Sequence, residues 1–288
     1  MRGGSLLAKK SCHCGYFCKS HITTSSVLRY EVKLLVSVAS EEEVAPAVDG
    51  GADIIDVKNP QEGPLGANFP CVIQRIRKLT PPELPVSATI GDAPNLPGMM
   101  ALAALGAAMC GIQYVKVGLL GTRSPRDAVF LLQQVCRAVR EYSPQTRIIA
   151  AAYADAHKVN AMPPLVLPAV AKEAGVDGCL LDTIRKGDGT LWTNLSDAQL
   201  QDFAAQCRHA HLLCALAGSL AEKDIPHVCK FKVDIIGVRT AACRGNRVSG
   251  FVDREKVQRL KKFIAANMFR ESFPLPAIPP DDAVHSRL

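Results

Sequence analysis

Two lysines of this sequence stand inside or at the end of short hydrophobic runs. Lys58 follows Val57, and Lys116 lies between Val115 and Val117. A charged ammonium group is costly to bury unless it is paired with a carboxylate or gives up its proton. Because a neutral lysine amine is the species that attacks a carbonyl carbon, this placement indicates Schiff-base chemistry.

Aspartates accompany these lysines. Asp56 precedes Lys58 by two residues, so their side chains share one face of an extended strand. Asp182 ends a later hydrophobic run, and Lys186 follows it. Such carboxylates would hold protons and stabilise an iminium. Structural salt bridges are the alternative, but several lysines and aspartates at the ends of hydrophobic runs favour catalysis.

Further polar residues and glycines follow other hydrophobic runs. We expect them to bind substrate or its phosphate, and they are Asp92, Tyr153, Asp155, Gly218, Ser219, Arg239 and Thr240. Arg239 could donate two parallel N–H groups to phosphate, and Gly218 would let the backbone approach it. The alternative for Arg239 is a structural ion pair with a buried carboxylate. The histidines have no spacing typical of a metal site, so no metal is expected.

The elements that must position these residues alternate regularly. Eight Val/Ile/Ala-rich runs are separated by segments with helical patterns, and the runs are 33–38, 53–58, 85–90, 113–118, 147–152, 178–182, 211–217 and 233–238. Ser124 caps an amphipathic segment over 124–141, and Ser196 with Gln199 forms a capping box.

Eight such units predict a (β/α)8 barrel, with the active site at the carboxyl ends of the strands. The charged face of the second strand, with Ile54, Asp56 and Lys58, would then face the barrel interior. A doubly wound sheet is the alternative, but Ala39-Ser40-Glu41 stands where its glycine-rich turn should follow the first strand.

Composition excludes several classes of protein. The chain has 288 residues, 48% of them hydrophobic, with 34 Lys+Arg and 27 Asp+Glu. Five basic residues and no acidic one lie in 1–30, which leaves 34 − 5 = 29 basic against 27 acidic residues elsewhere. A body so close to neutral argues against binding to nucleic acid or to a membrane surface. The hydrophobic runs are too short to span a bilayer.

The two ends differ from the middle of the chain. We expect an N-terminal extension over 1–30, a catalytic barrel over 31–267 and a proline-rich tail over 268–288. The extension could be a targeting segment. Ser286-Arg287-Leu288 resembles a peroxisomal address, and chance resemblance in a cytoplasmic or mitochondrial protein is the alternative.

The cysteines indicate a reducing compartment. From Cys71 onward they lie singly inside hydrophobic runs, as reduced intracellular thiols do. One cluster of possible metal ligands comprises Cys12, His13, Cys14, Cys18 and His21. A metal site is not favoured there, because the surrounding sequence has no strand or helix pattern that would hold the ligands in place.

Several longer strings carry a family resemblance. DVKNP with GPLGANFP in 56–70, YVKVGLLGTRS in 114–124 and DIIGVRTAAC in 234–243 resemble the (5-formylfuran-3-yl)methyl phosphate synthases, a family of methanofuran biosynthesis. The resemblance covers 34–266. It implies a TIM barrel that condenses two molecules of glyceraldehyde 3-phosphate to a furan-aldehyde phosphate, with release of phosphate and water and without metal or organic cofactor.

The resemblance also implies roles for individual residues. Lys58 matches the Schiff-base lysine and Lys116 the proton-transferring lysine, while Asp182, Lys186 and Asp56 match other active-site positions. Thr240 and the segment 185–193 depart from the family pattern.

Three functions therefore compete. The first is a furan-forming lyase, the second a class I aldolase-like enzyme for other phosphorylated aldehydes, and the third a phosphosugar-binding barrel without activity. We expect a small phosphorylated aldehyde as substrate and assembly into a homo-oligomer.

Overall fold

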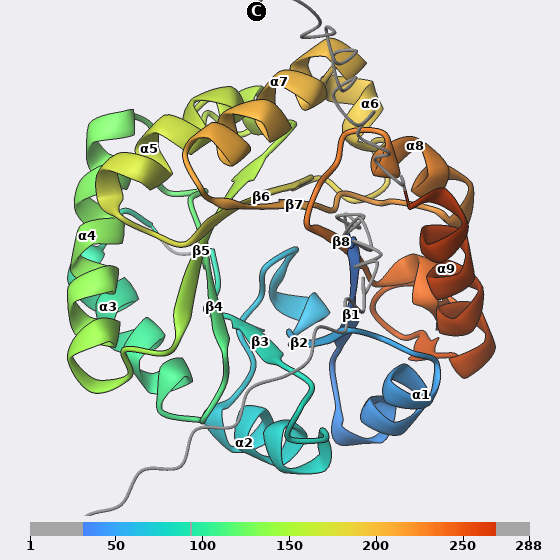
Figure 1. Ribbon diagram of the computed structural model, residues 1–288. Helices are drawn as coiled ribbons and strands as arrows, with labels where there is room; N and C mark the ends of the chain where they lie inside the picture. The colour runs from blue at the N-terminus through green and yellow to red at the C-terminus, as the bar shows by residue number, and fades with distance from the viewer. Residues whose placement is uncertain (1–30, 93, 269–288) are drawn as a thin grey trace, which may run out of the picture. The chain divides into compact units, whose positions relative to one another are not determined.

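The computed structural model describes residues 31–92 and 94–268. Eight parallel strands follow one another in chain order and close into a barrel, with helices outside it (Figure 1). The strands are β1 (Lys33–Val38), β2 (Ile54–Val57), β3 (Val86–Thr89), β4 (Tyr114–Gly118), β5 (Arg147–Tyr153), β6 (Gly178–Asp182), β7 (Leu213–Leu216) and β8 (Ile235–Val238). The predicted (β/α)8 barrel is confirmed, and each strand falls within one predicted run or within a residue of it.

Helices connect the strands. They are α1 (Val44–Asp49), α2 (Pro70–Leu79), α3 (Pro97–Ala108), α4 (Pro125–Tyr142), α5 (Leu167–Ala174), α6 (Leu191–Asn194), α7 (Asp197–His209), α8 (Ile225–Cys229) and α9 (Arg254–Asn267), with short 3-10 turns such as η1 (Glu41–Glu43) and η6 (Thr240–Ala242). The Ser124 side chain accepts a hydrogen bond from the N–H of Asp127, which confirms the predicted start of α4. The capping box of Ser196 and Gln199 is confirmed at the start of α7.

An antiparallel hairpin follows β8. Its strands are β9 (Cys243–Arg244) and β10 (Phe251–Val252), and it precedes α9. No sequence pattern had indicated it, because its two-residue strands are too short for an alternation of polar and hydrophobic residues to be seen.

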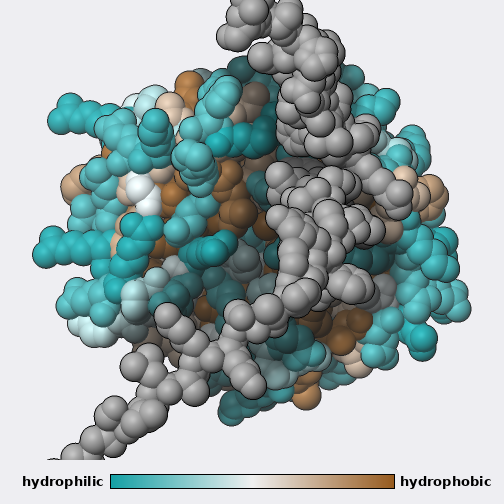
Figure 2. Space-filling view, viewed as in Figure 1, coloured by the Kyte–Doolittle hydropathy of each residue, from teal (hydrophilic) through white to brown (hydrophobic). Residues whose placement is uncertain are grey.

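Side chains of the barrel strands alternate between two cores. Ile55 and Val57 belong to a large cluster between the strands and the helices. Ile54 belongs to a smaller cluster inside the barrel, together with residues such as Leu35, Ile149, Leu180 and Ile235. In the view of Figure 2, the periphery is mainly hydrophilic and hydrophobic residues show between the polar ones. The alternation turns Asp56, with Ile54, towards the interior, as predicted.

Some expectations fall on other parts of the chain. The extension over 1–30 with its cysteine and histidine cluster, the tripeptide Ser286-Arg287-Leu288 and all of the tail except Met268 lie outside the described residues. Among the helices that the structure describes, none has the length and hydrophobicity to cross a membrane.

Candidate active site

Asp56 lies at the centre of a buried polar cluster inside the barrel. Its carboxylate is 2.7 Å from the ammonium of Lys116 and accepts a hydrogen bond of 2.8 Å from Ser37. Ser87 donates to its other oxygen. Burial alone would raise the pKa of Asp56, but the charges of Lys116 and Lys58 and the hydrogen bonds from Lys116 and Ser87 hold it below its usual value. The charged carboxylate form of Asp56 is therefore favoured.

Among the three lysines of the described site, Lys58 is the one without a partner. Its residue is 7% exposed, and its ammonium makes no hydrogen bond or ion pair within the described part of the chain. Burial lowers its pKa to about 7; Asp182 opposes this shift and Lys116 adds to it. The sequence predicts that Asp56 shares a face with Lys58 and stabilises positive charge there. The Asp56 charge does raise the pKa of Lys58, but the ion pair of Asp56 is with Lys116.

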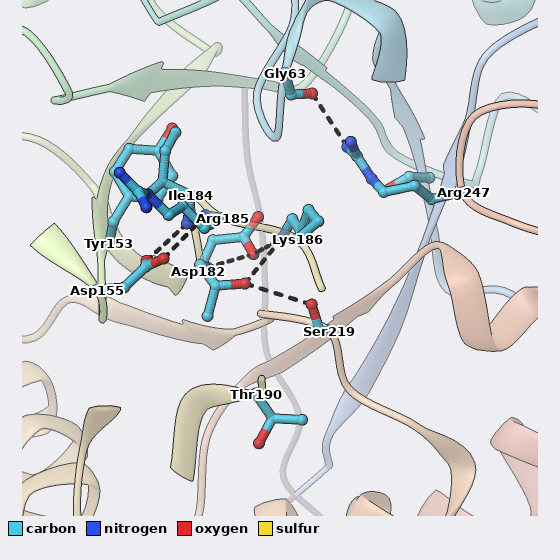
Figure 3. A network of polar contacts seen from close by, with 12 residues as sticks. Gly63, Tyr153, Asp155, Asp182, Ile184, Arg185, Lys186, Thr190, Ser219 and Arg247 are labelled. Atoms are coloured by element: carbon cyan, nitrogen blue, oxygen red, sulfur yellow. Dashed lines mark hydrogen bonds and ion pairs between the residues drawn. The ribbon is translucent and has the colours of Figure 1, made fainter. Parts of the chain in front are cut away.

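Lys186 and Asp182 form a second ion pair at the end of β6. The ammonium of Lys186 is 2.5 Å from the Asp182 carboxylate and donates a 3.2 Å hydrogen bond to Thr183 (Figure 3). Burial tends to raise the pKa of Asp182, but Lys186, Lys58 and the hydrogen bonds to its carboxylate keep it below the usual value. Both carboxylates beside Lys58 therefore stay charged.

Asp155 fixes the loop that carries Lys186. Its two oxygens accept the backbone N–H groups of Ile184, at 2.7 Å, and Arg185, at 2.9 Å (Figure 3). Asp155 is 1% exposed and is not among the described residues that line the central cavity. The expectation that it binds substrate is corrected: both oxygens are occupied by the backbone, so Asp155 positions Lys186.

Asp92 and Tyr153 contact each other at the ends of β3 and β5. The Tyr153 hydroxyl donates to one Asp92 oxygen, while the other oxygen is buried without a partner among the described residues. Burial raises the pKa of Asp92 to about 6, against the hydrogen bond from Tyr153. A Cβ on Gly118 would strike the Asp92 carboxylate, so this glycine makes room for it. Neither predicted binding residue is among the described residues that line the cavity.

A cavity opens above the inner core. Its floor is hydrophobic and consists of Leu35, Ile54, Ile149, Leu180, Ala215 and Ile235. Its polar walls hold the predicted residues Lys58, Lys116, Asp182, Lys186, Gly218, Ser219, Arg239 and Thr240. The structure therefore brings Lys58, Lys116, the second ion pair and the loops after β7 and β8 around one space.

The turn after β7 presents its backbone to this cavity. Gly218 has a φ of 101° and Ser219 a φ of 56°, a left-handed conformation that is uncommon for serine. The N–H groups of both residues donate no hydrogen bond to other described residues. Backbone donors held in this way suit an anion.

Arg239 lines the cavity as expected, but protein groups already accept hydrogen bonds from its guanidinium. Its guanidinium lies 2.9 Å and 3.2 Å from the two oxygens of the buried Glu43. It also donates to the carbonyls of Ser37, Arg247 and Gly250. The structural alternative is therefore the one observed, because Glu43 neutralises Arg239 and protein carbonyls take its other N–H groups.

Sequence reasoning had missed several residues of the site. Ser37 and Ser87 are recognisable only once strand register places them beside Asp56. Glu43 stood in a run of three glutamates without a distinguishing pattern. Arg247, on the β9–β10 turn, lines the cavity and donates to the carbonyls of Pro60 and Gly63, and Figure 3 shows the contact with Gly63.

The geometry can support attack on a carbonyl group. A buried amine with a pKa of about 7 lines a cavity with a hydrophobic floor and interacts electrostatically with two lysine–aspartate pairs. The pairs can supply and accept protons, and their carboxylates can stabilise a positive iminium.

Comparisons with known proteins identify the family of this chain. The family described as 4-HFC-P synthase matches residues 34–261. The (5-formylfuran-3-yl)methyl phosphate synthase of Methanocaldococcus jannaschii is 48% identical over 230 residues, which is 80% of this chain and 98% of that protein. The protein of the same name from Methanothermobacter thermautotrophicus is 44% identical over 232 residues, with the same coverage of both chains.

Solved structures share the barrel at low sequence identity. The 3-hexulose-6-phosphate synthase of Salmonella typhimurium gives a TM-score of 0.57 at 16% identity, covering 82% of this chain and 100% of that one. KGPDC from Streptococcus mutans gives 0.56 at 12% identity, covering 82% and 98%. These likenesses show the fold alone. The match over the whole barrel and the relatives of this name show that the chain belongs to the 4-HFC-P synthase family.

Proposed function

We propose that this enzyme is a lyase that condenses two molecules of glyceraldehyde 3-phosphate to a furan-aldehyde phosphate, (5-formylfuran-3-yl)methyl phosphate. Inorganic phosphate and water leave during the reaction. The proposal rests on membership of a family of synthases and on the residues around the cavity.

Lys58 is the proposed nucleophile. Its neutral amine attacks the aldehyde carbon, and loss of water from the adduct forms an imine. Protonated, this imine is a cation, and the carboxylate of Asp182 stabilises it, as it already stabilises the Lys58 ammonium. The single observation that carries the proposal is this buried lysine, which lacks a partner among the described residues and whose pKa is lowered to about 7.

The two ion pairs are the proposed proton carriers. Lys116, held by Asp56, transfers protons to and from the bound aldehyde on one side of Lys58. Lys186, held by Asp182, gives a proton to oxygen that leaves on the other side. Elimination of water and phosphate needs such transfers at more than one atom, which two separate pairs can provide.

The phosphate of one substrate would bind after β7 and β8. Gly218, Ser219 and Thr240 line the cavity there, and the N–H groups of Gly218 and Ser219 donate to no other described residue. Arg239 has no part in this proposal, because Glu43 already neutralises it.

Incubation with glyceraldehyde 3-phosphate tests the reaction. A new near-ultraviolet absorbance of a furaldehyde and release of inorganic phosphate are expected. Borohydride should fix the substrate to the peptide that contains Lys58, and Lys58→Arg should show neither effect, since a guanidinium cannot act as this nucleophile. Trapping without furaldehyde would favour the aldolase-like alternative, and absence of trapping would contradict the imine itself.

Location in the cell stays a prediction. We propose an enzyme of an intracellular compartment, with the peroxisome as the destination if Ser286-Arg287-Leu288 is read as an address. A fluorescent fusion with and without these three residues would test it, and identical distributions would contradict the address.

A further inference from the structure

The charges of the cavity are balanced, with one exception. Three cations of its wall each have a carboxylate partner: Lys116 with Asp56 at 2.7 Å, Lys186 with Asp182 at 2.5 Å, and Arg239 with Glu43 at 2.9 Å. Lys58 can lose its proton near neutral pH. Arg247 is left as the lining cation of fixed charge that has no carboxylate within ion-pair distance among the described residues.

Among the described residues, the Arg247 guanidinium donates to backbone carbonyls only. One terminal nitrogen donates to the carbonyl of Pro60, at 3.3 Å, and the other to that of Gly63, at 3.1 Å; Figure 3 shows the contact with Gly63. A guanidinium has five N–H donors, so three remain for a ligand. The side chain is half-buried, which strengthens its attraction for an anion relative to a fully hydrated arginine.

The position of Arg247 also suits an anion. It lies where the central cavity adjoins a second, more open hollow, and both are lined by Lys186, Ser219, Thr240 and Arg247. A phosphate ester at this junction would have a guanidinium on one side and the Ser219 turn and Thr240 hydroxyl on the other. Arginine binds phosphate through paired N–H groups that lysine lacks.

We infer that Arg247 determines specificity for phosphorylated aldehydes by binding the phosphate ester at this junction. The inference rests on the proposed function and names the residue that selects its substrates. It also links two parts of the site, because Arg247 holds the loop that begins directly after Lys58. Arg247 would then position both ends of the substrate, the phosphate by direct contact and the aldehyde through the loop next to Lys58.

Borohydride trapping with two aldehydes tests the inference. Glyceraldehyde 3-phosphate carries the phosphate, and glyceraldehyde does not. We expect Arg247→Gln to raise the concentration of phosphorylated substrate needed for half-maximal trapping by roughly 10- to 100-fold, with Arg247→Lys in between. Trapping of glyceraldehyde should change less than twofold. Arg244→Gln is the matched control, because Arg244 lies on the same hairpin but is exposed and pairs with Asp253.

The outcomes separate this inference from the proposed function. An equal loss with both aldehydes would show that Arg247 only holds the loop, and no loss with either would place the phosphate elsewhere; both results overturn the inference. If wild-type protein traps neither aldehyde, the imine proposal fails. Calorimetric binding of inorganic phosphate to wild type and Arg247→Gln then still decides the anion site, and equal affinity would refute it.

Discussion

At the scale of single residues, the proposed chemistry depends on which of the three lysines that line the cavity are paired with a carboxylate and which is not. Lys116 and Lys186 have carboxylate partners, whereas Lys58 has none among the described residues and its pKa is about 7. The division comes from the register of the strands. Asp56 and Lys58 are close in sequence, but residues two apart on a strand are separated by about 6.5 Å along it, and Lys116 on β4 comes closer.

The pH dependence of borohydride trapping should show that Lys58 has a lowered pKa. Because only the neutral amine attacks, borohydride trapping at Lys58 should rise with pH and level off above about 7. Lys116→Gln removes a positive charge that lowers the pKa of Lys58 and leaves Asp56 without its lysine, so the profile should shift to higher pH. Mass spectrometry of the trapped peptide across a pH series measures both. A profile centred near 10 in the wild type would contradict the buried amine.

Asp92 should make stability depend on pH in the opposite sense to an ordinary aspartate. Its pKa in the folded protein is about 6, above the usual 3.8, so folding favours the protonated form and stability decreases as pH rises from about 4 to about 6. Asp92→Asn should raise the free energy of unfolding at pH 7 to 8 by about 1–3 kcal/mol and have no effect near pH 4. Urea denaturation at both pH values checks this. A loss of stability at pH 7 would mean that the carboxylate is required.

At the scale of elements, the Arg239–Glu43 pair joins three parts of the chain. Glu43 on η1 also accepts the N–H groups of Ala39 and Val252, and Arg239 donates to carbonyls on the β9–β10 turn. The pair therefore fastens the hairpin that carries Arg247 to the end of β1.

Breaking this pair should be costly. Glu43→Gln leaves a buried guanidinium without a counter-charge and should lower the free energy of unfolding by about 3–5 kcal/mol. Glu42→Gln, on the exposed neighbour, should change it little. Thermal and urea denaturation of both variants measure the difference. If Arg239→Lys weakened phosphate binding without loss of stability, the original expectation of a phosphate ligand would be restored.

The elements were predictable because their signals are local. Hydrophobic runs, the cap at Ser124 and the capping box at Ser196 each lie within a few residues of the structure they specify. Sequence also indicated which face of β2 is inward, and hence that Lys58 lies inside the barrel. The partners of Lys116, Arg239 and Asp155 were not predictable, because each depends on contacts between segments distant in the chain.

At the scale of the whole molecule, α3 presents hydrophobic residues outside as well as inside. Leu102 is 73% exposed, and Met99 is 48% exposed. Phe130 on the adjacent α4 is 55% exposed. Gly98 and Gly106 flank Leu102 by one turn on each side, and a Cβ on either would meet nothing within 4 Å. Glycine lowers helix stability by about 1 kcal/mol relative to alanine. Because neither glycine has a side chain, the helix surface is flat at these two positions and another surface could pack closely against it.

The expected homo-oligomer should therefore form through α3. A leucine between two glycines is self-complementary, since a twofold axis would place each Leu102 beside a glycine of the other copy. Leu102→Asp should reduce the mass measured by sedimentation, with the thermal stability of the monomer largely kept. Phe263→Asp, on α9 across the barrel from α3 (Figure 1), is the control. An unchanged mass for Leu102→Asp would exclude this surface.

The hydrophobic floor of the cavity has a consequence for the order of events. The barrel is closed beneath Lys58 by hydrophobic side chains, namely Leu35, Ile54, Ile149, Leu180 and Ile235. Substrates must therefore enter, and products leave, through the opening above Lys58. In the proposed reaction, the aldehyde that reacts with Lys58 would bind first, because a second molecule above it would block the path to this lysine. The six-carbon product would remain attached to Lys58 at the deepest point, so a phosphate released above it would leave first. Steady-state kinetics should then show ordered binding of the two aldehydes. Free phosphate should inhibit binding of the second aldehyde more strongly than binding of the first.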